Sequence, residues 1–168
     1  DLAAKVGKSC DFAIHAGDIV EGHYENRRAG HIFELDHIGG DAQVKYASEE
    51  LKKLQIPLYF IAGNHCKTFM KIAGFDIGTR LQELVPNSKY LGMQSGVLEF
   101  DFGKKLMLSH PDGGSSYAIS YKTQKIIDAM EGGAKPEILV IGNFHKAEYL
   151  FYRNIHAIQA GCLERQTP

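Results

Sequence analysis

Short apolar runs recur along the chain, and most of them end at a glycine or a histidine. In several runs apolar and polar residues alternate, and a period of two is typical of a strand with one buried face. Leu98, Phe100 and Phe102 follow this alternation. The pattern predicts strands at residues 11–16, 56–62, 97–102, 105–110, 137–142, 147–152 and 155–160.

Apolar residues at helical spacing lie between several of these strands and predict three helices. The first is expected over 43–54. A short second helix is expected to begin after Asp76, because an aspartate side chain caps free backbone N–H groups well. The third, capped by Ser115 or Ser116, is expected to reach about Met130.

Two pairs of neighbouring strands are separated only by short turn segments. Gly103 lies between the strands at 97–102 and 105–110, and Arg153-Asn154 separates AEYLFY from IHAIQA. Asparagine tolerates the positive φ that tight hairpin turns require. Strand–helix–strand order followed by hairpins is typical of packed sheets. We therefore expect an α/β fold with two packed, mostly β sheets (a β-sandwich) flanked by helices.

The length of 168 residues fits a single domain over 1–168. Residues 1–9 resemble the end of a helix that begins upstream, and residues 161–168 stop without a closing element. We therefore expect the chain to be truncated at both ends. The segment 20–42 has weak periodicity and is expected to form a loop or a short helix over the candidate site.

The composition, 44% hydrophobic and 23% charged with a net charge of −1, is that of a globular protein without a general attraction to nucleic acid or anionic membranes. No apolar stretch approaches the length of a membrane span, and the N-terminus lacks the regions of a signal peptide. The three cysteines are scattered, at Cys10, Cys66 and Cys162, which argues against a disulfide framework. We expect a cytoplasmic protein with no membrane partner.

Four short segments place polar side chains directly after predicted strands. GDIVEG follows FAIHA, GNHC follows PLYFIA, HP follows KLMLS, and GNFH follows EILVI. In open α/β sheets, ligands gather beyond the carboxyl ends of the strands. The candidate site residues are therefore Asp18, Asn64, His65, His110, Asn143 and His145.

Carboxylate, amide and imidazole groups together suit divalent metals such as Mn, Fe, Zn or Mg. Two such ions about 3.5–4 Å apart can hold a phosphoryl group and lower the pKa of a bound water. The pair needs one bridging carboxylate, and Asp18 is placed for that role. His65, beside a ligand, can donate a proton to the leaving oxygen. These features predict a metal-dependent hydrolase.

The four segments, in this order and spacing, resemble the calcineurin-like metallophosphoesterases, of prokaryotic or phage type. The pattern of that family is D-x-H, then G-D, then G-N-H-D/E, then a lone H, then G-H-x-H. Its members hydrolyse phosphomonoesters or phosphodiesters with a metal-bound hydroxide at a two-metal centre, in a β-sandwich flanked by helices. The resemblance covers essentially the whole chain.

The resemblance implies a role for each matching residue. Asp18 corresponds to the bridging aspartate and His65 to the proton-donating histidine. Asn64 and His110 correspond to ligands of the second metal, and His145 to a ligand of the first. The implied cofactors are two divalent ions, such as Mn, Fe or Zn. The implied partner is a phosphate-ester substrate: a nucleotide, a small phosphoester or a nucleic acid.

The chain departs from the family pattern in three places. The D-x-H element, which supplies two ligands to the first metal, would lie before Asp1, so the first site is expected to be incomplete. Asn143 replaces the first histidine of G-H-x-H and is either a weaker second-site ligand or too short to reach the metal. Cys66 replaces the acidic residue after His65, so any orientation of that histidine from there is lost or changed.

Two other functions stay open. A degenerate domain that keeps the fold as an interaction scaffold would explain Asn143 and Cys66, although the other motif residues argue against it. A nuclease of the DNA-repair type would share the metal centre, but the near-neutral charge does not favour nucleic acid over nucleotides. Outside the motifs, Gly113–Ser116 is either a phosphate contact or a simple helix cap. His15 is expected to be a core histidine or to support a ligand from behind.

Overall fold

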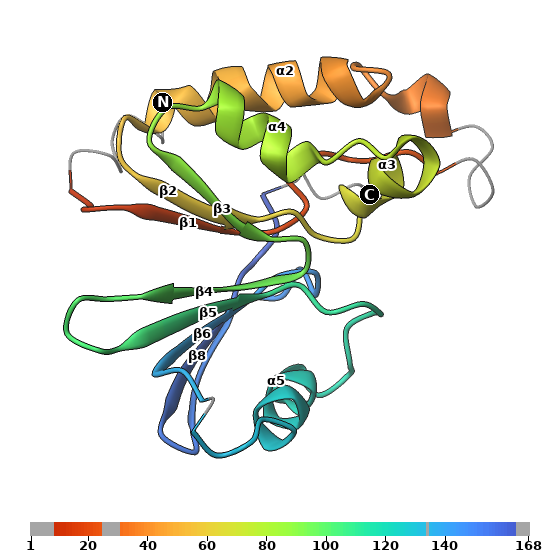
Figure 1. The fold of residues 1–168 in the computed structure, drawn as a ribbon. Coiled ribbons are helices and arrows are strands. Elements are labelled where there is room, and N and C mark those ends of the chain that lie inside the picture. The colour runs from red at the N-terminus through yellow and green to blue at the C-terminus, as the bar shows by residue number, and fades with distance from the viewer. Residues whose placement is uncertain (1–8, 25–30, 134, 164–168) are drawn as a thin grey trace.

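Two packed sheets form the centre of the computed structural model, which describes residues 9–24, 31–133 and 135–163 (Figure 1). The first sheet is parallel, with strands in the order β1 (Ala13–Ala16), β2 (Leu58–Ile61) and β3 (Ser88–Gly92). The second sheet has the order β4-β5-β6-β8-β7, from β4 (Ser95–Glu99), β5 (Lys105–Ser109), β6 (Ile138–Ile141), β7 (Glu148–Tyr152) and β8 (Ile155–Gln159). In the second sheet β5, β6 and β8 run parallel, and β4 and β7 are antiparallel to their neighbours.

Helices cover both outer faces of this pair of sheets. Figure 1 shows α2 and α4 outside the first sheet and α5 outside the second. The helices are α2 (Gly40–Leu51), α3 (Lys67–Ala73), α4 (Ile77–Leu84) and α5 (Ile119–Asp128), with short 3-10 helices at His31–Glu34 and Lys52–Leu54. The layers therefore run helix, sheet, sheet, helix, which is the mixed α/β arrangement of two sheets flanked by helices that the sequence predicts.

Strand alternation divides the apolar core into three clusters. In β2, Leu58 and Phe60 pack toward the helices with Leu81 of α4, whereas Ile61 packs toward the second sheet with Leu108 of β5. Burial of each such side chain contributes about 1.5–3 kcal/mol to folding. The third cluster joins α5 to the outer face of the second sheet through Ile127, Leu139, Ile141, Phe144, Ile155 and Ala157. The burial of β2 from both sides holds its carboxyl end in a fixed position.

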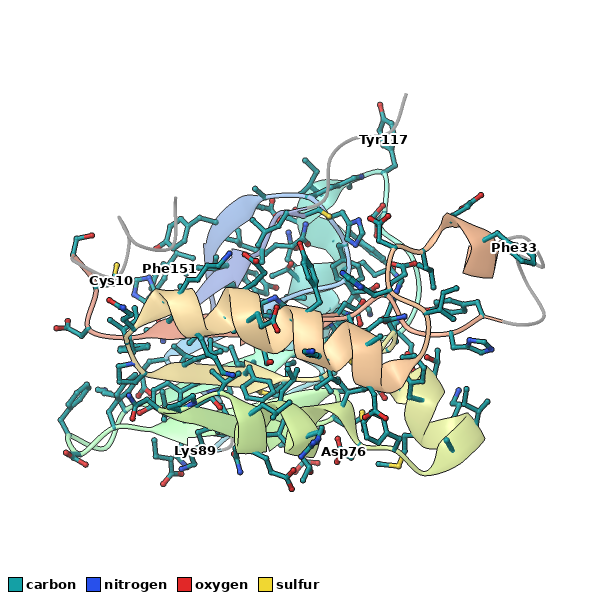
Figure 2. All side chains as sticks on the ribbon, turned by 90° about the horizontal axis from the view of Figure 1, so that it is seen from above. Cys10, Phe33, Asp76, Lys89, Tyr117 and Phe151 are labelled. Carbon is teal, nitrogen blue, oxygen red and sulfur yellow. The ribbon has the colours of Figure 1, made fainter. Side chains whose placement is uncertain are left out.

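The predicted Asp76 cap and both predicted hairpins are confirmed. The Asp76 carboxylate accepts hydrogen bonds from the N–H groups of Gly78 at 2.9 Å and Thr79 at 3.4 Å, so it caps α4 (Figure 2). Both predicted hairpins form, as the antiparallel pairs β4–β5 and β7–β8. Arg153 and Asn154 form the second turn with φ values of 50° and 65°.

Two elements escaped the prediction. Strand β3, Ser88–Gly92, has little apolar patterning and is a strand because its backbone pairs with β2, with Ser88 opposite Leu58. Helix α3, Lys67–Ala73, follows the GNHC segment directly and is too short to show a clear helical period. The strand predicted at 97–102 lies at Ser95–Glu99.

The third predicted helix starts later than expected. Helix α5 begins at Ile119 after an Ala118 cap without a side-chain hydrogen bond, so neither Ser115 nor Ser116 caps it. The Ser116 carbonyl instead accepts a hydrogen bond from Lys146 Nζ at 2.9 Å, which keeps this residue in the loop. The helix ends at Asp128, slightly before the predicted end at about Met130. The first helix begins at Gly40, upstream of its predicted start.

Some expectations fall outside the described residues. Residues 1–8 and 164–168, which carry most of the two predicted chain ends, are among them, as are residues 25–30 of the segment expected over the site. The described remainder of that segment is mostly irregular, with the 3-10 turn at His31–Glu34. In the part of the chain that the structure describes, no helix has the length and apolar character needed to cross a bilayer.

Candidate metal centre

The four polar segments meet because the strands before them end at one edge of the two sheets. Strands β1 and β2 are parallel and end in register, with Ala16 opposite Ile61. Strands β5 and β6 are also parallel, with Ser109 opposite Ile141. The residues after these four strands therefore emerge on the same side, two segments from each sheet.

Glycines allow these segments to approach closely. A Cβ atom on Gly17 would lie 2.3 Å from the His110 ring, and one on Gly63 would lie 2.3 Å from the Asp18 carboxylate. Both glycines have positive φ, 99° and 97°, which disfavours any side chain there. Asp18 itself has φ 56°, so the backbone turns sharply as it leaves β1. The two glycines leave the space in which the Asp18 and His110 side chains lie.

His110 is the buried centre of the candidate site. Its side chain is 2% exposed, and its Nδ1 lies 2.6 Å from the carbonyl oxygen of Ala16 in the other sheet. A carbonyl only accepts hydrogen bonds, so Nδ1 carries the proton and donates it. The other nitrogen, Nε2, lies 2.8 Å from Asp18 Oδ2 and 2.9 Å from Asn64 Oδ1.

This arrangement brings three lone pairs together. In a neutral His110 whose Nδ1 donates to Ala16, Nε2 has no hydrogen and faces two oxygen atoms that also only accept. Asp18 Oδ2 is buried and has no hydrogen-bond partner of good geometry among the described residues. Buried acceptors need either a proton between them or a cation. The donor set of one imidazole, one carboxylate and one amide oxygen therefore fits a divalent metal.

His65 lies on the other side of Asp18. Its backbone N–H donates to Asp18 Oδ1 at 2.8 Å, and its ring Nδ1 donates to the Glu21 carbonyl oxygen at 2.8 Å. Its Nε2 is 3.8 Å from Asp18 Oδ2, and the Glu21 carboxylate is 3.7 Å from Nδ1. Burial lowers the pKa of His65, but the hydrogen bond to Glu21 and the charges of Asp18 and Glu21 outweigh it and raise the pKa to about 9. Without a cation nearby, the ring is therefore protonated at neutral pH.

A cavity of about 490 Å³ opens beside these residues. Asp18, His65 and His110 line it, together with Asn143 and His145 from the loop after β6. His145 is exposed and makes no hydrogen bond or ion pair with the described residues, so its imidazole is available to a ligand. Asn143 is engaged differently, because its amide nitrogen donates to two backbone carbonyls. The structure thus brings the predicted site residues to one place, while their roles stay predictions.

His15 and Cys66 border the site, His15 in the wall of the cavity and Cys66 in the adjoining core. The buried His15 Nδ1 has no hydrogen-bond partner among the described residues, and burial lowers the pKa of this histidine to about 4 despite the nearby charge of Asp18. Cys66 is 1% exposed, and burial raises the pKa of its thiol to about 12. The thiol stays protonated at neutral pH, which makes it a poor metal ligand.

Two site residues were missed by sequence reasoning. Glu21 accepts the hydrogen bond from the His65 ring, and its position three residues after Asp18 was the available signal. Tyr24 packs the edge of its ring against His65 at 5.2 Å between ring centroids and is hydrogen-bonded to Asn64. Burial and the charges of Asp18 and Glu21 raise the pKa of the Tyr24 hydroxyl to about 12. Nothing in its sequence context marked Tyr24.

The candidate metal centre is not built from His, Cys, Asp and Glu side chains alone. Among the described residues, no three or more His, Cys, Asp and Glu side chains gather as a metal-binding cluster. The convergence around His110 depends on Asn64 supplying an amide oxygen. Such an oxygen is a weaker donor than a carboxylate, so further donors would be needed for tight binding.

Comparisons with known proteins give a fold likeness only. No protein-family model matches the chain, and no curated protein matches it. Among solved structures, an archaeal phosphodiesterase matches with a TM-score of 0.54 and 12% sequence identity, over 92% of this chain and 68% of the other. At this identity the match shows a shared arrangement of sheets and helices.

Proposed function

We propose that the chain is the catalytic domain of a phosphoesterase that uses two divalent metal ions. The observation that carries the proposal is the convergence of lone pairs from Asp18, Asn64 and His110, which only a proton or a cation can satisfy. The fold likeness to an archaeal phosphodiesterase supports it. The position of the site, at the carboxyl ends of parallel strands from both sheets, supports it as well.

Asp18, Asn64 and His110 would hold one cation through Oδ2, Oδ1 and Nε2, the atoms that already face one another. His145 would contribute to the other cation, with Asp18 bridging the two. When bound, divalent cations lower the pKa of a coordinated water and offset the negative charge of a phosphoryl group. The Ala16 carbonyl keeps His110 in the tautomer whose Nε2 has a free lone pair.

His65 is suited to proton transfer rather than to metal binding. Its Nδ1–H is committed to the Glu21 carbonyl, so the proton that its ring can release or accept is on Nε2, which points toward Asp18 and the cavity. A protonated His65 would give this proton to the leaving oxygen of the ester. The Glu21 carbonyl would hold the ring in that orientation. The next residue in the chain after His65, Cys66, is buried and gives the ring no such support.

The decisive test is metal-dependent turnover by the whole protein. After metal is removed with a chelator, we expect hydrolysis of p-nitrophenyl phosphate or bis(p-nitrophenyl) phosphate to fall at least about 100-fold. Addition of Mn²⁺ should restore it, and the preferred ester would separate monoesterase from diesterase action. Turnover that persists in excess chelator would contradict the proposal. Stoichiometric Mn²⁺ binding without hydrolysis of either ester would favour an interaction scaffold.

The His65→Ala variant is expected to lose turnover and keep its metal. We expect kcat to fall about 10²–10⁴-fold for an alkyl phosphate, because the leaving alkoxide then departs without a proton. For a p-nitrophenyl ester the loss should be much smaller, since nitrophenolate is a stable leaving group. His156→Ala, on the remote strand β8, is the matched histidine control. Equal losses for both esters, or loss of bound Mn²⁺ by elemental analysis, would contradict the assigned role.

A further inference from the structure

The loop between β5 and α5 passes beside the site and has little packing of its own. Residues 110–118 form no helix or strand. Tyr117 in this loop is fully exposed and points away from the body of the structure (Figure 2). The loop is instead held by hydrogen bonds from the segment after β6, where Asn143 and Lys146 donate to its backbone.

Asn143 makes two of these bonds with a single atom. Its side-chain nitrogen lies 2.6 Å from the carbonyl oxygen of Pro111 and 2.6 Å from that of Gly113. Two carbonyl oxygens repel a third oxygen at this distance, so the atom that faces them must be the amide nitrogen. Both amide hydrogens are then used, and the loop is closed around this side chain.

The same loop carries His110 at its start. The His110 backbone N–H donates to the Gln94 carbonyl at 2.7 Å, and Gln94 Nε2 donates to the Asp112 carboxylate at 2.9 Å. Lys67 Nζ in turn donates to Gln94 Oε1 at 2.6 Å. Gln94 therefore holds the loop at residues 110 and 112, and Asn143 holds it at residues 111 and 113, directly after His110.

We propose that Asn143 is a positioning residue whose amide nitrogen clamps the loop Pro111–Gly113 and so keeps His110 aimed at Asp18 and Asn64. The clamp is a property of the protein without metal, whereas its consequence for metal binding rests on the proposed function. Asparagine suits the position because φ there is 75°, a left-handed conformation that Asn and Asp tolerate. A histidine cannot replace the clamp, since neither ring nitrogen can donate two hydrogen bonds.

The Asn143→Asp variant separates this role from that of a ligand. The substitution keeps the size of the side chain and its tolerance of positive φ, but it places an oxygen against the Pro111 and Gly113 carbonyls. If Asn143 were a metal ligand through its oxygen, the added charge would tighten Mn²⁺ binding. Asn154→Asp is the matched control, because Asn154 is exposed, also has positive φ at 65°, and lies in the distant β7–β8 turn.

The measurement is hydrogen exchange of peptides that cover residues 110–114 in the chelator-treated whole protein, followed by Mn²⁺ titration. We expect the His110 N–H, which donates to the Gln94 carbonyl, to exchange at least about tenfold faster in Asn143→Asp than in the wild type, because the loop that follows it loses the donor to its Pro111 and Gly113 carbonyls. Asn154→Asp should match the wild type, and Mn²⁺ should bind Asn143→Asp about tenfold more weakly. Unchanged exchange with tighter Mn²⁺ binding would overturn the clamp in favour of the ligand role.

A third substitution and the metal-free readout keep the two proposals apart. Asn143→His, which restores the family residue, should also loosen the loop and lower activity, whereas a ligand role predicts a gain. Faster loop exchange in a protein that neither binds Mn²⁺ nor hydrolyses esters would leave the clamp standing and end the proposed function. Metal-dependent hydrolysis with an unchanged loop in both Asn143 variants would do the reverse.

Discussion

The His110→Ala variant is expected to lose metal at the position that Asp18, Asn64 and His110 surround, and to lose at least about 10³-fold in kcat/KM. The imidazole is the only nitrogen donor of this set, and its removal leaves two oxygens that face an empty space. The fold should also weaken by about 2–4 kcal/mol, because a buried ring is lost and the Ala16 carbonyl loses its donor. Elemental analysis and urea unfolding measure the two effects.

A second substitution at the same position separates metal loss from fold loss. In His110→Asn the side-chain amide nitrogen takes the place of Nδ1 and keeps a donor for Ala16, while the Nε2 donor is absent. We therefore expect His110→Asn to be more stable in urea than His110→Ala and yet equally unable to hold metal. If either variant kept wild-type metal content and turnover, His110 would not be a ligand.

The Asp18→Asn variant is expected to fold well and to be inactive. Asparagine tolerates the φ of 56° at this position, and its Oδ1 can still accept the His65 backbone N–H. Its amide nitrogen would take the place of Oδ2 and point a hydrogen at His110 Nε2, which satisfies that lone pair without a cation. In chelator, the midpoint of thermal unfolding should equal or exceed that of the wild type, while kcat falls at least about 10³-fold with Mn²⁺ present.

Asp18→Asn is informative because its thermal stability should be kept or increased while its activity is lost. A substitution that merely damages the fold lowers both quantities, as Gly63→Ala would by pressing a Cβ against the Asp18 carboxylate. If Asp18→Asn retained Mn²⁺ stoichiometry and activity, the carboxylate would be a turn residue rather than a bridging ligand. If the Asp18→Asn variant unfolded in chelator, the charge of Asp18 would matter more for the fold than for metal binding.

The sequence pattern anticipated the parts of the fold that local signals control. The Asp76 cap and the Arg153-Asn154 turn depend on residues that favour one backbone geometry, so both were predictable. The meeting of Asp18, Asn64 and His110 was predictable because parallel strands carry their carboxyl ends to one edge. Strand β3 was not predictable from its sequence, because it lacks a strand-like apolar pattern and becomes a strand by pairing its backbone with that of β2.

The parts of the site that escaped prediction depend on contacts between segments distant in sequence. The Asn143 amide reaches carbonyls at positions 111 and 113, and no spacing rule relates these residues. The Glu21 backbone carbonyl orients His65, and every residue has such a carbonyl, so the sequence does not show which one acts as the acceptor. The start of α5 was misplaced for a similar reason, since Lys146 holds Ser116 in the preceding loop.

The hydrogen bond from His110 to Ala16 also bears on the order of folding. It spans 94 positions along the chain and joins the two sheets, so its loop-closure entropy is paid only when the sandwich assembles. Asp18 and Asn64 follow strands of the first sheet and His110 follows a strand of the second, so a partly folded chain with one sheet formed lacks at least one of these three donors. A cation held by these donors would therefore bind the native state alone and would slow unfolding without accelerating folding. A metal bound at this centre would stabilise the two sheets after they have assembled and would not nucleate their assembly.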